Sequence, residues 1–245
     1  DLMLEQPNVY LSMGLTAENV AKKFNLSRKE QQEFAIKSHV NAAKAQTSKS
    51  FNDEITVIKK NDIQVSDDGG IRPNTSQEIL DNLKLVFDEN GSITAGTASP
   101  LTDGAAATLI CEEEYAKANK LPILARIKST AVQGCPPELM GLGPINATRK
   151  ALNRANLTID DIDVVELNEA FASQSIACIQ ELNINPDIVN MEGGAIALGH
   201  PLGATGTRIT AKAASLMVKK NKKYALATQC IGLGQGIATV LERVE

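Results

Sequence analysis

The order of hydrophobic and polar positions divides the chain into two parts. In the first hundred residues, polar residues interrupt the apolar positions. Ser27 lies three residues before Glu30, which is the spacing of a helix-capping box. The small or apolar residues that follow at helical spacing are Phe34, Ala35, Ser38, Ala42 and Ala45. We therefore predict a helix of about five turns after Ser27. The stretches 67–70 and 88–91, rich in Asp, Asn and Gly, predict turns.

From Gly104 onward, short apolar runs alternate with helical patterns. The run 105–111 is typical of a strand buried on both faces, and Asn168 is expected to start a helix directly after a strand. The later strands are expected at 122–132, 162–167, 224–229 and 237–242, and the helices at 112–120, 145–155, 168–181 and 207–220. This alternation predicts an α/β fold with a mixed, mainly parallel sheet covered by helices, an antiparallel edge from the last two strands, and a helical loop subdomain before them.

Composition excludes several classes of protein. Of the 245 residues, 43% are hydrophobic and 22% charged, as in ordinary globular proteins. Lys+Arg 25 against Asp+Glu 29 gives a net charge of -4, and without a basic cluster this disfavours nucleic-acid binding. No apolar run approaches the roughly 20 residues that cross a bilayer. We expect a cytoplasmic protein without nucleic-acid or membrane partners, and the start Asp1-Leu2-Met3 looks like the middle of a longer protein.

Cysteines and histidines are few and scattered. Cys111, Cys135, Cys178 and Cys230 form no CxxC pair, and the only histidines are His39 and His200. This spacing predicts no zinc site and no disulfide framework, so reduced thiols are expected.

Three segments at expected strand-to-helix or strand-to-strand junctions carry polar side chains. Asn168 follows the strand that ends at Leu167, His200 lies in the glycine-rich stretch 193–206, and Cys230 precedes Gly-x-Gly-x-Gly. In α/β sheets such junctions bind ligands. Each residue also has a structural interpretation: Asn168 as a helix cap, His200 as a turn residue, Cys230 as a buried strand end. An imidazole in a glycine-rich turn before a helix is nevertheless well placed for proton transfer.

The glycine-rich stretch does not fit a nucleotide-binding fingerprint. No Lys-Ser/Thr pair follows its glycines as in a Walker motif, and the first spacing of Gly199, Gly203 and Gly206 is wrong for a Rossmann motif.

Several segments resemble motifs of the thiolase family. NEAFA from Asn168, GGAIALGHPLGATG from Gly193 and CIGLGQG from Cys230 are similar, in order, to the three carboxy-terminal motifs of that family. MGLTAENVA from Met13 and ITAGTASPLTDGAAA from Ile93 resemble its loop-domain and core motifs. The resemblance implies a thiolase-like layered fold with three parts. These are a loop subdomain at 1–100, a remnant of the amino-terminal core at 101–122, and the carboxy-terminal core at 123–245.

The resemblance also implies an activity. Thiolases are acyltransferases of fatty acid metabolism that cleave a 3-ketoacyl-CoA with free CoA, or run the reverse Claisen condensation of acetyl-CoA. CoA is then a substrate, no other cofactor or metal is expected, and a homodimer or homotetramer is implied. Acyl chain length and reaction direction stay open at this point.

The family's site residues carry over onto matching positions. His200 would activate a nucleophilic cysteine and bind a thioester oxygen, and Cys230 would act as acid and base on the α-carbon. Asn168 would hold a water of one oxyanion site, and the Gly232 N–H would serve the other. Neighbouring donors would lower the Cys230 pKa from about 8.5. The substrate contacts implied are Met140 and Phe171 in the pocket wall, Ser99 on the pantetheine chain, and Arg72 near the CoA nucleotide.

One expected element is missing from this pattern. The family's nucleophilic cysteine belongs to an amino-terminal segment that would precede residue 1, so the isolated chain is expected to be inactive. Cys111 and Cys178 are expected to be structural, while Cys135 lies in a loop. The alternatives are a non-catalytic acyl-CoA- or lipid-binding protein of thiolase type, and a fragment that needs a complementing chain.

Overall fold

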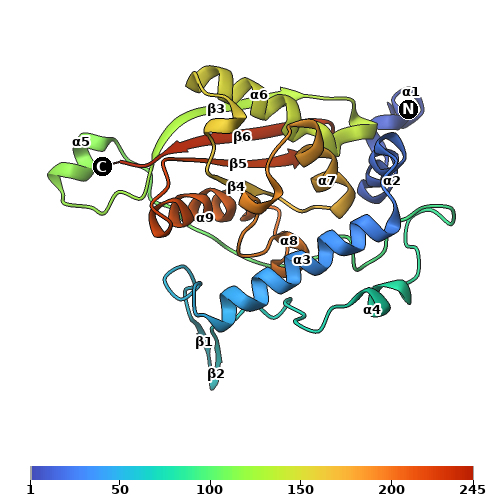
Figure 1. The fold of residues 1–245 in the computed structure, drawn as a ribbon, viewed down its shortest axis with the longest axis horizontal. Helices are drawn as coiled ribbons and strands as arrows, with labels where there is room; N and C mark the ends of the chain where they lie inside the picture. The colour runs from blue at the N-terminus through green and yellow to red at the C-terminus, as the bar shows by residue number, and fades with distance from the viewer. Residues whose placement is uncertain (1, 245) are drawn as a thin grey trace.

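The computed structural model describes residues 2–244; Asp1 and Glu245, at the outer limits of the expected subdomains, lie outside the described residues. Its centre is a four-stranded sheet with the strand order β3-β6-β5-β4 (Figure 1). These strands span Arg126–Gly134 for β3, Val164–Leu167 for β4, Tyr224–Ile231 for β5 and Gln235–Glu242 for β6. The strands expected at 122–132, 162–167, 224–229 and 237–242 are therefore present, with shifted ends.

Strand directions place three chain segments at one edge of this sheet. β4 and β5 are parallel, and β6 runs antiparallel to both β5 and β3. Consequently β3, β4 and β5 share a direction, and their carboxyl ends lie at the same edge. The mixed, helix-covered sheet is confirmed. Two details differ from the sequence-based expectation, because β3 pairs with β6. Only the β4–β5 pair among the three strand pairs of this sheet is parallel, and the antiparallel β5–β6 hairpin lies in the centre of the sheet instead of at its edge.

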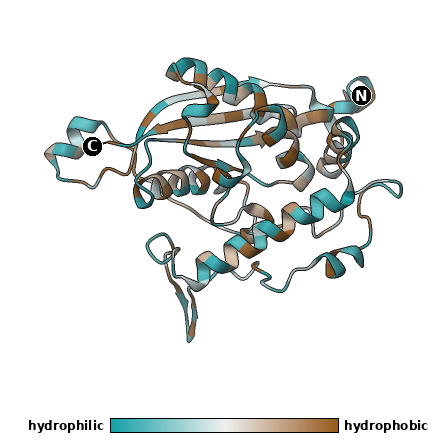
Figure 2. Cartoon of the chain, in the orientation of Figure 1, coloured by the Kyte–Doolittle hydropathy of each residue, from teal (hydrophilic) through white to brown (hydrophobic). Residues whose placement is uncertain are grey.

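Helices cover both faces of the sheet. Ala147 and Ala151 of α6 (Gly143–Ala155) pack in one core with Val165 and Leu226, and this core also includes Cys178 of α7 (Ala172–Glu181). α9 (Thr205–Lys219) packs on the other face against the alternate strand positions, among them Val164 and Ala227. Figure 1 accordingly shows α6 and α9 on opposite sides of the sheet, and Figure 2 shows hydrophobic positions along its strands.

The first part of the chain lies across the end of this layered unit. Its elements are α1 (Leu2–Glu5), η1 (Pro7–Tyr10), α2 (Met13–Phe24), α3 (Arg28–Thr47), the hairpin β1 (Ile58–Lys60) and β2 (Ile63–Val65), and α4 (Gln77–Asp81). The capping box before α3 is confirmed: Glu30 N–H donates to Ser27 Oγ (3.2 Å), and Ser27 N–H donates to a Glu30 carboxylate oxygen (2.7 Å). Ala35 of α3 packs with Leu80 and Ile196.

The remaining short elements connect these parts. They are α5 (Glu113–Ala118), η2 (Pro137–Leu142), η3 (Ile159–Asp161), η4 (Pro186–Ile188) and α8 (Ala195–Leu198). The turns expected at 67–70 and 88–91 are present, whereas the β1–β2 hairpin and α8 were not anticipated. No helix within residues 2–244 combines the length and apolarity that a bilayer crossing requires.

Two sequence-based expectations are wrong. The run 105–111 is an extended segment without strand pairing; Leu109 and Ile110 are 76% and 72% exposed. A strand forms only beside a partner for its N–H and C=O groups, and no described strand runs next to this segment. The helix expected from Asn168 begins at Ala172, because the Asn168 N–H donates to Thr228 O (3.0 Å) and so extends the β4 ladder. Asn168 is therefore not a helix cap.

Candidate active site

Asn168 and His200 meet at the edge where β4 and β5 end. Asn168 follows β4 and is fully buried, while His200 lies between α8 and α9. The Asn168 side-chain nitrogen Nδ2 is 3.4 Å from Nε2 of His200. An amide and an imidazole that are 32 residues apart in the chain are thus neighbours in the fold.

The other ring nitrogen of His200 is held by Thr205. Nδ1 lies 2.7 Å from Thr205 Oγ1, and this hydroxyl donates its own proton to Pro201 O (2.9 Å). Thr205 must therefore accept a hydrogen bond from Nδ1–H, which leaves a lone pair on Nε2 facing the Asn168 amide. Burial, and then the positive charge of Arg208, lower the pKa of His200. The ring is accordingly a neutral base with Nε2 as its accepting atom.

The backbone before His200 requires glycine. Gly199 has a φ of 94°, and a Cβ there would lie 2.5 Å from Thr102 Cγ2. The same threonine accepts a hydrogen bond from the His200 N–H through Oγ1 (3.2 Å). Thr102 lies so close that it holds the turn before the imidazole in place. Gly199 is therefore needed both for its positive φ and because a side chain would collide with Thr102.

A buried carboxylate ties the segment after β4 to its surroundings. Glu169 accepts hydrogen bonds from Ser38 Oγ (2.6 Å), Asn190 Nδ2 (2.8 Å) and Ile196 N–H (3.1 Å). Burial raises its pKa. Because these donors come from α3, the loop before α8, and α8 itself, Glu169 sets the position of Asn168 relative to the His200 segment. The sequence analysis did not identify Glu169. The feature that could have revealed it is a charged residue shortly after a mainly apolar predicted strand.

Cys230 lies in a small apolar cluster near the end of β5. It packs with Met140, Ala170 and Phe171. Burial raises the pKa of its thiol to about 12. The expectation that neighbouring donors lower this pKa is therefore wrong, because the thiol is surrounded by apolar side chains. With this pKa the Cys230 thiol carries its proton at neutral pH.

Two further expected residues lie around this cluster. The N–H and Oγ of Ser99 both donate to Ala170 O, at 3.0 and 3.1 Å. Gly232 is exposed in the β5–β6 turn, and a Cβ at this position would meet no atom within 4 Å. Phe171 contacts Phe87 edge-on, with ring centroids 6.1 Å apart. Met140 and Phe171 thus pack with Cys230, Ser99 is bound to Ala170 of the same cluster, and the turn at Gly232 is open.

Arg72 lies apart from these residues. It is exposed after β2, and its N–H donates to His39 Nδ1 (3.2 Å) on α3. Burial, and then the charge of Arg72, lower the pKa of His39. Within residues 2–244, no hydrogen bond or ion pair connects Arg72 with His200 or Cys230.

The other cysteines differ in exposure. Cys178 is buried on α7, where burial raises its pKa, and its thiol contacts Gly141 O at 3.5 Å. Cys135 is half-buried, and burial raises its pKa as well. Cys111 was expected to be packed in a strand but is exposed. Among the described residues, no group of three or more His, Cys, Asp or Glu side chains could hold a metal ion.

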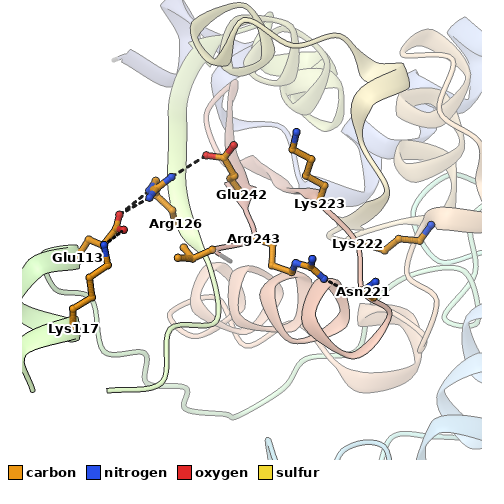
Figure 3. A pocket seen from close by; sticks show the side chains of 9 residues that line it. Glu113, Lys117, Arg126, Asn221, Lys222, Lys223, Glu242 and Arg243 are labelled. Carbon is orange, nitrogen blue, oxygen red and sulfur yellow. Dashed lines mark hydrogen bonds and ion pairs between the residues drawn. The ribbon is translucent and has the colours of Figure 1, made fainter. Parts of the chain in front are cut away.

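A charged cavity of about 410 Å³ lies at the opposite edge of the sheet (Figure 3). Its wall includes Arg126 at the start of β3 and Glu242 at the end of β6. Figure 3 shows Arg126 between Glu242 and Glu113, with which it forms ion pairs at 3.3 and 2.5 Å. Because β3 starts where β5 also starts, this cavity is separate from the Asn168–His200 edge.

Comparison with known proteins gives a consistent result over nearly the whole chain. Residues 2–114 match the family model described as "Thiolase, N-terminal domain", and residues 121–243 match "Thiolase, C-terminal domain". A 3-ketoacyl-CoA thiolase of Shewanella loihica is 53% identical over 240 residues, 94% of this chain and 62% of that protein. A 3-ketoacyl-CoA thiolase of Shewanella denitrificans is 51% identical over 241 residues, which are 95% of this chain and 62% of that protein. The chain thus spans about 62% of the length of these relatives.

Solved structures agree. The Bacillus anthracis acetyl-CoA acetyltransferase superposes with a TM-score of 0.92 at 39% identity, over 96% of this chain and 60% of that one. Human mitochondrial 3-ketoacyl-CoA thiolase in complex with CoA superposes with a TM-score of 0.91 at 40% identity, over 97% of this chain and 60% of that chain.

Proposed function

The chain belongs to the thiolase family, and on this premise we propose that it takes part in acyl transfer at CoA. The reaction is thiolytic cleavage of a 3-ketoacyl-CoA or the reverse condensation of acetyl-CoA. The observation that carries this proposal is the approach of Asn168 to a neutral His200, 3.4 Å apart, at the edge where β5 ends one residue after Cys230. An imidazole whose Nε2 carries a lone pair can take the proton of a thiol.

Asn168 and Gly232 are proposed to stabilise negative charge on thioester oxygens. Asn168 Oδ1 is buried and has no partner among the described residues, so it can accept a hydrogen bond from a water molecule. That water would donate its second hydrogen to one oxygen. The N–H of Gly232, in an open turn, would serve the other. Preorganised donors of this kind stabilise an oxyanion in the transition state.

Cys230 is proposed to exchange a proton with the α-carbon of the acyl group. A thiol with a pKa of about 12 is protonated before the reaction and can donate to the carbanion formed when the carbon–carbon bond breaks. In the condensing direction the thiolate would have to form first, at a cost set by its burial. The environment of Cys230 therefore supports its role as the acid in cleavage.

Substrate contacts are proposed at the remaining expected positions. Met140 and Phe171 beside Cys230 would form the pocket wall, and Ser99 would contact the pantetheine chain. Arg72, exposed and positively charged, would reach the nucleotide end of CoA. The division into a loop subdomain (1–100), a core remnant (101–122) and a carboxy-terminal core (123–245) belongs to the same proposal, as do a cytoplasmic location and a homodimeric or homotetrameric state.

The attacking cysteine is proposed to lie outside residues 1–245. Cys178 and Cys230 are buried with raised pKa values, and Cys135 also has a raised pKa. Cys111 is exposed and makes no hydrogen bond to a base among the described residues. None has the features of an activated thiol. We therefore expect the 245-residue chain alone to show no thiolase turnover.

The test is thiolysis of a 3-ketoacyl-CoA by the full-length protein, followed by the release of acyl-CoA. His200→Ala should reduce kcat by about 100-fold or more, as expected for loss of a general base. His39→Ala is the control, because His39 contacts no proposed site residue other than the Arg72 backbone, and it should retain turnover. Unchanged turnover in the His200 variant would overturn the proposal. CoA binding without turnover in the wild type would instead favour a non-catalytic carrier.

A further inference from the structure

The outer edge of β4 is lined by the segment that leads into the glycine-rich stretch. β4 lies at one end of the strand order, with β5 as its neighbour. An edge strand leaves a row of N–H and C=O groups without strand partners. Val189 forms a parallel bridge with Val165 of β4, and the next residue, Asn190, donates its N–H to Val165 O (2.9 Å). Residues 189–190 therefore run alongside β4 and supply partners for its outer edge.

The side chain of Asn190 continues this pairing beyond the bridge. The Leu167 N–H donates to Asn190 Oδ1 (2.9 Å), and Asn190 Nδ2 donates to Leu167 O (2.8 Å). A carboxamide offers the same kinds of donor and acceptor as a peptide group, so it takes the place of a strand neighbour for Leu167. The second hydrogen of Nδ2 goes to Glu169 Oε1 (2.8 Å). Asn190 is 4% exposed, and both polar atoms of its buried side chain are paired.

These contacts hold the two neighbours of Asn168 in the chain. Leu167 precedes Asn168, Glu169 follows it, and both are bound to the same carboxamide. On the side of β5, the Asn168 N–H donates to Thr228 O (3.0 Å). The backbone of Asn168 is therefore fixed from both sides, and this sets the direction in which its side chain leaves the end of the strand.

Asn190 also lies at the start of the segment that ends in His200. Its carbonyl oxygen accepts a hydrogen bond from the Gly193 N–H (2.9 Å). Glu169, the second partner of its carboxamide, accepts one from the Ile196 N–H (3.1 Å), four residues before His200. One residue thus connects the two chain segments whose side chains meet at the edge of the sheet.

The backbone conformation of Asn190 does not by itself account for these contacts. Its φ is 45°, in the left-handed region that asparagine adopts more readily than most residues. Asn156, at the end of α6, has a similar φ of 55°, but it is exposed and its side chain makes no hydrogen bond within the described part of the chain. The two asparagines share a conformation, and only Asn190 uses its carboxamide.

We propose that Asn190 is a positioning residue for the contact between Asn168 and His200. Its carboxamide holds the residues on either side of Asn168, and the amide of Asn168 therefore lies against Nε2 of His200. The Asn190 side chain acts through Leu167 and Glu169 and not by bonding the imidazole itself. The effect on acyl transfer rests on the proposed function, whereas the placement of the two side chains does not.

The first test separates the carboxamide from the backbone conformation. Asn190→Gly removes the side chain and keeps a residue that tolerates a positive φ. In the full-length protein, kcat for thiolysis of a 3-ketoacyl-CoA should fall about tenfold or more, while KM for CoA stays within about twofold, because the proposed CoA contacts lie at other residues. Asn156→Gly is the matched control and should retain the wild-type kcat. An unchanged kcat in folded Asn190→Gly would overturn the proposal.

A second pair of variants preserves the volume of the side chain. Asn190→Asp keeps an acceptor for the Leu167 N–H but places an oxygen against Leu167 O and the Glu169 carboxyl group, so kcat should again fall. Adding Glu169→Gln returns a donor to this contact. The double variant should recover kcat by about threefold or more over Asn190→Asp alone. Equal kcat in the single and double variants would overturn the proposal even if Asn190→Gly fails to fold.

NMR of the 245-residue chain tests the placement without turnover. The Leu167 N–H is bonded to Asn190 Oδ1, so its exchange with solvent should become faster in Asn190→Gly and stay slow in Asn190→Asp. The Nε2 chemical shift of His200 should change in both variants, because the Asn168 amide no longer lies in place, and should not change in Asn156→Gly. An unchanged His200 signal in both Asn190 variants would contradict the positioning role.

The two kinds of measurement separate this inference from the proposed function. If the wild type has no thiolase turnover but the His200 signal responds to the Asn190 variants, the proposed function fails and the positioning role stands. If turnover is normal and neither kcat nor the His200 signal responds, the role of Asn190 fails alone.

Discussion

Thr205 Oγ1 accepts the Nδ1–H of His200 at 2.7 Å while donating to Pro201 O at 2.9 Å. The hydroxyl has one proton and uses it on the carbonyl, so this pair of contacts determines which ring nitrogen of His200 carries hydrogen. A threonine five residues after the histidine, in the first turn of α9, thus decides which nitrogen faces Asn168.

Thr205→Val should weaken this control. Without the acceptor at Nδ1, the imidazole loses its preference for one tautomer and one orientation, and we expect kcat to fall about tenfold or more. The nitrogen chemical shifts of His200 should change with it. Thr210→Val is the matched control, since Thr210 also donates to the carbonyl four residues back, Gly206 O (2.7 Å), without touching the histidine. Equal losses in both variants would contradict the interpretation.

Glu166→Gln should change how stability depends on pH. The folded pKa of Glu166, about 8, is above its usual value of 4.5, so the folded state binds the proton more tightly than the unfolded state. The contribution of this group to the free energy of unfolding is therefore fully favourable below about pH 4.5. It is lost as pH rises towards 8, and the free energy of unfolding falls by at most about 1.4 kcal/mol per pH unit. The variant lacks this loss.

Urea unfolding at pH 5, 7 and 9 measures the difference. Glu166→Gln should become more stable than the wild type by a few kcal/mol at pH 9 relative to pH 5. Glu181→Gln, at the exposed end of α7, should follow the wild-type dependence. Parallel curves for the Glu166 variant and the wild type would show that this carboxyl group is not protonated in the folded state.

The four cysteines should react with iodoacetamide at very different rates at pH 8. Cys111 is exposed and should be alkylated first, and half-buried Cys135 more slowly. Cys178 and Cys230 are buried thiols with raised pKa values, so little thiolate is available and both should be protected. Peptide mass spectrometry measures the order, with urea-unfolded protein as the reference in which all four react. Labelling of Cys230 as fast as Cys111 would contradict its apolar environment.

Gly199→Ala should destabilise the turn before His200. The positive φ and the approach of Thr102 make a Cβ unfavourable there, and we expect a loss of about 1–3 kcal/mol of unfolding free energy. Gly203→Ala, in the same segment, is the control because a Cβ there meets nothing within 4 Å. Thermal unfolding of the two variants should give a lower Tm for the first only.

Much of the local structure could be predicted from the sequence. The capping box at Ser27, the helices α5, α6 and α9, and the strands β4, β5 and β6 follow from patterns within short windows. The run 105–111 shows the limit of such reasoning. Its apolar residues have strand character, but pairing depends on a neighbour elsewhere in the fold, and none is present among the described residues.

The sequence by itself determined which chemical groups are available: one imidazole in a glycine-rich turn, one amide after a strand and one thiol before a second glycine-rich turn. It also indicated the thiolase family, which the comparisons confirm. Only the tertiary structure decided the state of these groups, namely the tautomer of His200, the contact of Asn168 with its Nε2 and the protonated thiol of Cys230. Protonation depends on burial and on charges from other elements, and residue order alone does not specify either.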